Sequence, residues 1–383
     1  MKKNMKILFA GDFCQRYRTD DVIKSKQYSK LFGEIKPIVE GADYSIVNFE
    51  FPVIKIHERA QPIKKCGPNL EGTIEAVDAI KYAGFKCCTL ANNHILDQGD
   101  DCCMDTIKEL REHGIDTVGA ESNLKEAARI LYKQINNKTL AIINCCEHEF
   151  TIATDATPGA YPLDPVLQYY QIQEAKANAD YAVVIVHGGP EFYQLPTPRM
   201  QDLYRYFVDL GADAVINHHQ HCYCGYELYK NKPIFYGLGN LCFDNPSEKN
   251  GTWNEGYIVV LNINEKTTEM SFELIPYKQC DEVVGVHISK QRDAFNRKIE
   301  ELNAIIVNKE ELNKKTKEYY DASSSFYFNY WRYYEHKWLN KFCDKKWLSP
   351  QFSTTKLYSF WNIIECEAHR DKVYYAFRKF LGR

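Results

Sequence analysis

The sequence lacks any hydrophobic run long enough to cross a membrane. Its longest uninterrupted apolar segment, Tyr181 to Val186, has six residues, whereas a membrane-spanning helix needs about 18–20. The apolar stretch near the N-terminus is too short for the core of a signal peptide, and it leads directly into Gly11 and Asp12 as a first strand would. These absences predict a cytoplasmic protein without a transmembrane segment.

Paired Cys-x-x-Cys motifs are also missing, although the chain contains 14 cysteines. Disulfide frameworks are typical of short secreted chains, and this chain has 383 residues. We therefore expect most of the thiols to be reduced, small apolar groups in the core. Cys222 and Cys224 lie beside a histidine cluster, so zinc binding by this pair stays open as an alternative.

The sequence carries little net charge: its formal charge at pH 7 is only −3. This balance argues against general nucleic-acid binding. The charge is unevenly distributed: residues 285–383 hold 19 Lys and Arg against 12 Asp and Glu, a net +7, which leaves −10 for residues 1–284. Residues 319–383 also carry 20 of the 52 aromatic residues. We therefore predict a domain of residues 1–284 and an extension of residues 285–383.

Short apolar runs alternate with amphipathic segments along the first part of the chain. The runs are often β-branched, which is typical of buried strands, and they cover Ile7–Ala10, Tyr44–Val47, Lys86–Leu90, Leu140–Asn144, Ala182–Val186, Ala214–Ile216 and Ile234–Tyr236. Helical spacing covers residues 70–82, 101–113 and 198–210. The alternation predicts an α/β fold with a largely parallel sheet. Gly256–Ile263 and Met270–Ile275 are predicted to be antiparallel strands.

Polar side chains with metal-binding chemistry follow six of these runs. They are Asp12; Asn48 and Glu50; Asn92, Asn93 and His94; His187; His218, His219 and His221; and Asn240 and Asp244. In open α/β sheets, ligands bind at the carboxyl ends of the strands, so these groups are expected to meet at one edge. Carboxylates with imidazoles are ligands for zinc, manganese or iron, and a mixed set this large suits two ions better than one.

Each of these groups also has an ordinary structural explanation. A single Asp after a strand is usually a turn former or helix cap, and Asn92-Asn93 fits a simple turn. His187 before two glycines fits the end of a strand. Three histidines within residues 218–221 are harder to explain this way, and the coincidence of all these groups at strand ends favours a metal site.

At this point the sequence resembles the CapA family, bacterial capsule and poly-γ-glutamate synthesis proteins related to calcineurin-like metallophosphoesterases. The resemblance covers roughly residues 6–275. It is carried by Gly11-Asp12, Asn48-Phe49-Glu50-Phe51-Pro52, Ala91-Asn92-Asn93-His94-Ile95-Leu96-Asp97-Gln98-Gly99, His187-Gly188-Gly189-Pro190-Glu191, Gly211-Ala212-Asp213-Ala214-Val215-Ile216 with His219-Gln220-His221, and Tyr236-Gly237-Leu238-Gly239-Asn240 with Phe243-Asp244.

The resemblance implies a four-layer α/β/β/α sandwich that holds two divalent ions of manganese, zinc or iron. Its implied ligands are Asp12 and His221 for the first ion, Asn93, His187 and His219 for the second, and Glu50 as a bridge. His94 would lie beside a substrate phosphate as an acid or charge stabiliser. Asn48 would lie nearby, and Asn240 and Asp244 would line the site. Cys14 stands where related phosphoesterases have a histidine, and a thiolate there would favour zinc.

The implied function is hydrolysis of a phosphate ester by a hydroxide activated at the two ions, in the synthesis of capsule or another cell-surface polymer. The substrate would be a phosphorylated sugar, a lipid carrier or a polymer end. Two alternatives stay open: a non-catalytic or weakly catalytic component of a capsule or poly-γ-glutamate assembly complex, and a metal-dependent amide hydrolase.

The extension is predicted to be helical. Residues 288–320 are polar with apolar residues at helical spacing, which indicates an exposed helix or helical linker, and residues 326–383 indicate further helices. The extension has two possible roles. It either packs its aromatic residues on the main domain as a cap, or it presents them as a binding surface. With its net +7 charge, that surface would suit sugar chains, polyanions or an anionic membrane. Oligomeric state is not indicated by the sequence.

Overall fold

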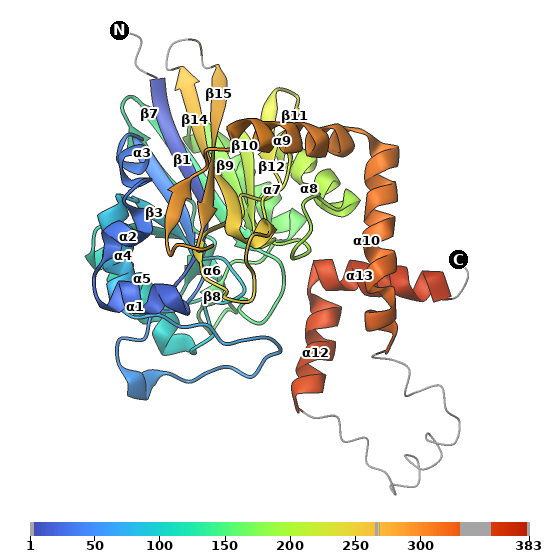
Figure 1. The fold of residues 1–383 in the computed structure, drawn as a ribbon, viewed down its shortest axis with the longest axis horizontal. Coiled ribbons are helices and arrows are strands. Elements are labelled where there is room, and N and C mark those ends of the chain that lie inside the picture. The colour runs from blue at the N-terminus through green and yellow to red at the C-terminus, as the bar shows by residue number, and fades with distance from the viewer. Residues whose placement is uncertain (1–3, 265–266, 268, 330–353, 381–383) are drawn as a thin grey trace, which may run out of the picture.

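The computed structural model describes residues 4–264, 267, 269–329 and 354–380. Its first sheet combines parallel strands with an antiparallel edge (Figure 1). Within the described residues the strands run in the order β16 (Val286–Ile288), β15 (Met270–Gln279), β14 (Glu255–Asn264), β1 (Asn4–Cys14), β2 (Tyr44–Phe49), β3 (Cys87–Thr89) and β4 (Asp116–Val118), with β13 (Asn240–Phe243) paired to β1. β1 is parallel to β2 and β13 and antiparallel to β14.

The second sheet has a parallel centre and antiparallel edges. Its order is β11 (Tyr226–Tyr229), β12 (Lys232–Phe235), β10 (Ala214–His218), β9 (Tyr181–His187), β7 (Lys138–Cys146) and β6 (Leu131–Ile135). The strands β12, β10, β9 and β7 are parallel to their neighbours in this order. A short pair, β5 (Ala120–Glu121) and β8 (Gly159–Ala160), lies apart from both sheets.

Helices cover the outer face of each sheet. The first sheet is covered by α1 (Arg18–Lys24), α2 (Tyr28–Phe32), α3 (Lys36–Glu40), α4 (Glu75–Ala83) and α5 (Asp100–Glu112). The second is covered by α7 (Pro165–Asn178), α8 (Pro198–Leu210) and α9 (Arg292–Val307). The other short helical turns are η1 (His57–Arg59), α6 (Leu124–Ala127) and η2 (Thr252–Asn254).

Side-chain alternation along β1 explains why four layers form. Ile7 and Phe9 enter the core shared by the two sheets, whereas Leu8 and Ala10 enter the core beneath α1 to α5. Successive side chains of a strand point to opposite faces, so a strand apolar at every position must be covered on both sides. The predicted α/β/β/α sandwich is confirmed in this arrangement.

The predicted strands all appear, with most bounds extended by a few residues, and the helices predicted at 101–113 and 198–210 appear as α5 and α8. The helix predicted at 70–82 was wrong at its start, because α4 begins at Glu75. Before it, Gly72 donates its backbone N–H to Pro52 and accepts one from Ile54. This pairing holds the segment extended instead of helical.

β13 was not predicted, because Asn240 was placed in a loop after the preceding strand. The strand docks beside β1 through a close backbone approach, in which the N–H of Asp12 donates to the carbonyl of Gly239 over 3.1 Å. A Cβ on Gly11 would lie 1.9 Å from that carbonyl oxygen. Only glycine at position 11 lets the two segments approach this closely.

The helical extension is confirmed as α10 (Lys309–Asn329), α12 (Thr354–Glu365) and α13 (Glu367–Phe380), which lie to one side of the sandwich (Figure 1). Residues 330–353 of the predicted helices, and 381–383 of the basic C-terminal end, lie outside the described residues. The helix predicted within 288–320 is confirmed as α9 and the first part of α10. Its apolar face is not exposed, because Phe295, Ile299 and Leu302 are buried against the sandwich. The division after residue 284 stays a prediction.

Candidate metal centre

Strand register brings the predicted site residues together at one edge of the sandwich. In the first sheet, Asp12 on β1 stands opposite Asn48 on β2 and Asn240 on β13. In the second sheet, His187 on β9 stands opposite His218 on β10. The residues lie at or next to the carboxyl ends of parallel strands, except Asn240, which begins β13. The two sheets therefore deliver carboxylates and amides from one side and imidazoles from the other.

Nitrogen atoms of neighbouring residues surround the carboxylate of Asp12. Its Oδ1 accepts from Nδ2 of Asn48 over 2.8 Å and lies 3.0 Å from Nδ1 of His218. Its Oδ2 accepts from the backbone N–H of His219 over 3.2 Å and lies 3.8 Å from Nδ1 of His221. Burial acts to raise the pKa of Asp12, but the hydrogen bond and charge of His218 outweigh it and lower the pKa. Asp12 is therefore held as a carboxylate, the form that binds cations.

The ring of His219 lies between those of the other two predicted histidine ligands, His187 and His221, and neighbours both. Nε2 of His187 is 3.1 Å from Nδ1 of His219 and 3.1 Å from the side-chain oxygen of Asn93. Nδ1 of His221 is 2.9 Å from the side-chain oxygen of Asn240. Burial lowers the pKa of both His187 and His221. Neutral imidazole is the form that binds metal ions.

The backbone that carries two of these histidines is strained. His219 and His221 have φ angles of 92° and 55°, a region that residues with a side chain rarely adopt. Such conformations persist where the surrounding structure imposes them, and they cluster at functional sites. Here the strained turn follows β10 directly and aims both rings back at Asp12 and Glu50.

Glu50 supplies a direct test of whether a cation fits. Its side chain is fully buried, and its Oε1 has no hydrogen-bond partner among the described residues. This oxygen lies 3.6 Å from Nε2 of His187 and 3.7 Å from Nε2 of His221. Burial, followed by the charge of Asp12, raises the pKa of Glu50 well above its usual range. A cation would give Oε1 a partner and would offset the burial of Glu50 and the repulsion from Asp12. The residues therefore fit a metal ion.

Ligand atoms gather in two groups that share Glu50. Among the described residues, Asp12, Glu50 and His187 form one group and Glu50, His219 and His221 form another, each with ligand atoms within 4.8 Å of one another. The resemblance instead divided the histidines by placing His187 with His219 and His221 with Asp12. The shared position of Glu50 agrees with a bridging role, and the division of the other ligands between ions stays a prediction.

His94 lies at the edge of this centre. Its Nδ1 is 2.6 Å from Oδ2 of Asp97 and 3.1 Å from Nζ of Lys65, which itself pairs with Asp97. Because a carboxylate only accepts hydrogen bonds, Asp97 favours the tautomer with its proton on Nδ1. Burial and the charge of Lys65 lower the pKa of His94 to about 4. Its ring is therefore neutral, with Nε2 free of the proton.

Two other residues that the resemblance singled out face elsewhere. Asp244 forms a bidentate ion pair with Arg18, with a shortest distance of 2.6 Å, and joins no ligand cluster of the described residues. Cys14 packs in the core beneath α1 to α5. It too is absent from the ligand clusters within the described ranges, and burial raises its thiol pKa.

Sequence reasoning missed three kinds of contributor to this region. His218 was recognised in the histidine cluster but given no role, although it is 3.0 Å from Asp12. Glu149 follows β7 and accepts from Nδ2 of Asn93 over 3.1 Å; an acidic residue after a strand was the available signal. Cys366 and His369 come from the extension, where only their three-residue spacing could have drawn attention.

Comparison with known proteins assigns the chain to a family. A profile described as bacterial capsule synthesis protein PGA_cap matches residues 6–245. The chain belongs to the PGA_cap family. All of the predicted metal ligands lie inside the matched region, and α10, α12 and α13 lie outside it.

Two curated proteins resemble this PGA_cap chain closely. It is 33% identical over 248 residues to the capsule biosynthesis protein CapA of Bacillus anthracis, which covers 63% of this chain and 60% of that protein. It is 34% identical over 239 residues to the PGA biosynthesis protein CapA of Bacillus subtilis strain 168, which covers 62% of each. The match thus spans about 60% of the length of these relatives.

Likeness to solved structures is weaker. A 5′-nucleotidase precursor from Thermus thermophilus is 10% identical with a TM-score of 0.42, over 78% of this PGA_cap chain and 57% of that one. A likeness this weak says nothing about activity. In the part of the chain that the structure describes, no helix combines the length and hydrophobicity needed to cross a bilayer.

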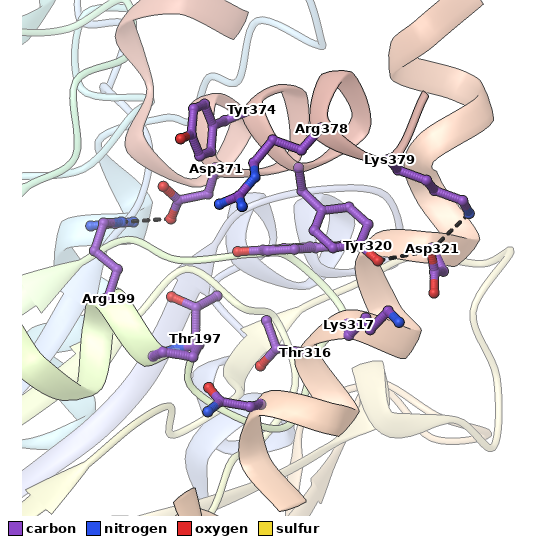
Figure 2. A pocket seen from close by; sticks show the side chains of 13 residues that line it. Thr197, Arg199, Thr316, Lys317, Tyr320, Asp321, Asp371, Tyr374, Arg378 and Lys379 are labelled. Carbon is purple, nitrogen blue, oxygen red and sulfur yellow. Dashed lines mark hydrogen bonds and ion pairs between the residues drawn. The ribbon is translucent and has the colours of Figure 1, made fainter. Parts of the chain in front are cut away.

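A pocket of about 730 Å³ lies away from the metal centre, between α8, α10 and α13 (Figure 2). Arg199 reaches across it to Asp371 over 2.7 Å, and Lys379 pairs with Asp321. Lys317 and Arg378 also line the pocket. None of the predicted metal ligands is among its lining residues.

Proposed function

We propose that this chain is a metal-dependent hydrolase of phosphate esters that acts in the synthesis of capsule or another cell-surface polymer. The observation that carries the proposal is the pair of ligand groups that share the buried carboxylate of Glu50. The polymer context is supported by membership of the PGA_cap family and by the names of the two Bacillus relatives.

The donor set supports two divalent ions of manganese, zinc or iron, because it combines carboxylate, imidazole and amide groups. Asp12, Glu50, Asn93, His187, His219 and His221 would hold them. Ions bound there would supply an activated water and neutralise charge on a phosphoryl group. Asn48 would orient Asp12 through its 2.8 Å hydrogen bond, and Asn240 would orient His221 through the 2.9 Å contact.

His94 would move a proton at Nε2. Its ring is neutral near pH 7, since its pKa is lowered to about 4 by burial and Lys65. A phosphate dianion beside Nε2 would favour the protonated ring. Asp97, at 2.6 Å from Nδ1, would hold the ring in place, and the protonated Nε2 would donate to the departing oxygen.

Substitution of two histidines tests this proposal. We expect His94→Ala to lower the rate on a generic phosphoester by about 10²–10⁴-fold while metal content stays unchanged. His219→Ala should lower metal content and activity together, because His219 is assigned as a ligand. Equal loss of metal in both variants would make His94 a ligand and contradict its assigned role.

A non-catalytic role in an assembly complex is the second candidate, because the predicted ligands are all buried. Asn93 and His94 expose 7% and 8% of their surface, and Asp12 and Glu50 at most 1%. A panel of phosphomonoesters, phosphodiesters and γ-glutamyl amides, assayed with each metal and with chelator, separates the candidates. Turnover of amides alone would support an amide hydrolase, and no turnover with any metal would support the assembly role.

We also propose that the pocket between α8, α10 and α13 binds an anionic polymer. Lys317 and Arg378 line it in addition to Arg199 and Lys379, whose charges are matched by Asp371 and Asp321. Tyr320, Tyr374 and Tyr375 add aromatic surface, which suits stacking against sugar rings. Three basic and three aromatic residues of the extension thus line a pocket that a polymer could enter.

A further inference from the structure

A third group of ligand-type side chains lies between the sandwich and the extension. Glu149, Cys366 and His369 place one carboxylate oxygen, one sulfur and one imidazole nitrogen within 4.8 Å of one another. Glu149 follows β7, and the other two lie at the junction of α12 and α13. Residues separated by more than 200 positions in the sequence are therefore brought together by docking of the extension.

The start of α13 explains how Cys366 and His369 come to share one face. Cys366 directly precedes α13, and its carbonyl accepts the N–H of Arg370 over 2.9 Å, as the first turn of a helix requires. Side chains three residues apart on a helix are neighbours. Cys366 is 1% exposed, so its sulfur is turned inward toward Glu149, whose Oε1 is 3.8 Å away.

Neighbouring groups hold two of the three side chains in orientation. Nδ1 of His369 is 2.6 Å from the hydroxyl of Tyr327 on α10, which leaves Nε2 as the ring nitrogen available to a cation. Oε2 of Glu149 accepts from Asn93, which leaves Oε1 beside the sulfur. Metal-binding histidines typically use their second nitrogen in such a hydrogen bond, which fixes the ring.

We propose that Glu149, Cys366 and His369 form a third metal site, separate from the two ligand groups that share Glu50, and that its ion is zinc. Thiolate, imidazole and carboxylate are the donors that zinc prefers, and a three-residue set leaves a fourth position for water. Two of its three ligands, Cys366 and His369, lie outside the region that the family profile matches, residues 6–245, whereas Glu149 lies inside it. It does not depend on hydrolysis of any substrate.

The site borders the main centre and fastens the extension beside it. Oε1 of Glu149 is 3.8 Å from Nε2 of His219. Glu149 therefore lies beside a predicted ligand of the main centre as well as beside Cys366 of the third site. An ion bound by one residue of the sandwich and two of the extension cross-links them. The position of α12 and α13 beside the metal centre would then depend on zinc, since metal binding stabilises the arrangement that supplies the ligands.

Zinc stoichiometry in the full chain tests the site. After chelation and titration with zinc, Cys366→Ser and His369→Ala should each bind one equivalent less than the unsubstituted chain. Cys66→Ser is the matched control, because Cys66 is a half-buried thiol that belongs to no ligand cluster of the described residues; it should bind as much zinc as the unsubstituted chain. Equal stoichiometry in all four proteins would overturn the proposal.

Cobalt substitution gives a second readout that is independent of activity and of the main centre. A cobalt ion bound to Cys366 produces a thiolate-to-cobalt charge-transfer band, which the predicted ligands of the other two ions, all oxygen and nitrogen, do not produce. We expect the band in the unsubstituted chain and in Cys66→Ser, and its loss in Cys366→Ser. Absence of the band from the unsubstituted chain, or its loss in Cys14→Ser instead, would contradict the assignment.

Hydrogen exchange tests the fastening role in the same proteins. Zinc should slow exchange of residues 354–380 in the unsubstituted chain and in Cys66→Ser, but not in His369→Ala. His369 is only half-buried, so its variant is expected to fold. If zinc slows exchange equally in His369→Ala, the ion does not hold the extension through this site.

Discussion

Glu50 is the residue at which the two ligand groups of the main centre meet. Its buried Oε1 lacks a hydrogen-bond partner among the described residues, and its pKa is raised by burial and by Asp12. Leaving a buried carboxylate oxygen unsatisfied is costly. The residues around Glu50 therefore suit a cation, which would give Oε1 a partner and offset this cost.

Substitution Glu50→Gln tests this explanation. It keeps the shape of the side chain but removes the charge that both ligand groups share, so we expect the metal content of the main centre to fall to less than half. Glu191→Gln is the control, because Glu191 interacts with His219 and His221 through its charge but joins no ligand cluster of the described residues. Equal metal content in Glu50→Gln and the control would remove Glu50 from the ligand set.

At the scale of elements, Arg199 links α8 to the extension. Its guanidinium is 2.5 Å from Glu147, which is almost fully buried, and 2.7 Å from Asp371 on α13. Thr197 caps α8 by accepting the N–H of Met200, and Pro198 occupies the first turn. The cap therefore fixes where the helix begins and where Arg199 projects.

We expect Arg199→Met to destabilise the protein by about 2 kcal/mol. Removing one partner of a fully buried ion pair costs about 3–5 kcal/mol, and the 28% exposure of the Arg199 side chain reduces that figure. Asp371→Asn, which leaves the pair with Glu147 intact, should cost less. Urea denaturation measures the free energy of unfolding of both variants. An equal loss in the two would show that the ion pair between Arg199 and Glu147 does not stabilise the protein.

Some of the strands and site contacts could be predicted from the sequence, and others could not. The strands at residues 7–10 and 182–186 were predictable because a run that is apolar at every position must be buried on both faces. Convergence of Asp12 with Asn48 was predictable because neighbouring parallel strands end at one edge of a sheet. The site formed by Cys366 and His369 was not, because it depends on how α13 docks, and no periodicity in the sequence specifies that contact.

At the scale of the whole molecule, charge is divided between the sandwich and the extension. Residues 1–284 carry −10 and residues 285–383 carry +7, and the pocket between α8, α10 and α13 is where described basic residues of the extension meet the sandwich. A polyanion attracted to this pocket would be held between α8 of the sandwich and the helices α10 and α13 of the extension.

Charge reversal in the pocket tests the proposed polymer contact. We expect Lys317→Glu combined with Arg378→Glu to weaken binding of fluorescent poly-glutamate by at least about tenfold at low ionic strength, and salt to reduce the difference. Lys108→Glu on α5 is a control for net charge. If the control weakens binding as much as one pocket substitution does, attraction is to the molecule as a whole. Vesicles of anionic lipid, tested in parallel, show whether a membrane surface is bound instead.

Anomalous diffraction from crystals grown with manganese tests the central claim, a two-metal centre bridged by Glu50. We expect two peaks about 3.5–4 Å apart, one on each side of the Glu50 carboxylate, with Asp12, His187, His219 and His221 as the surrounding ligands. A single peak remote from Glu50, or no peak while these side chains keep the same positions, would contradict it.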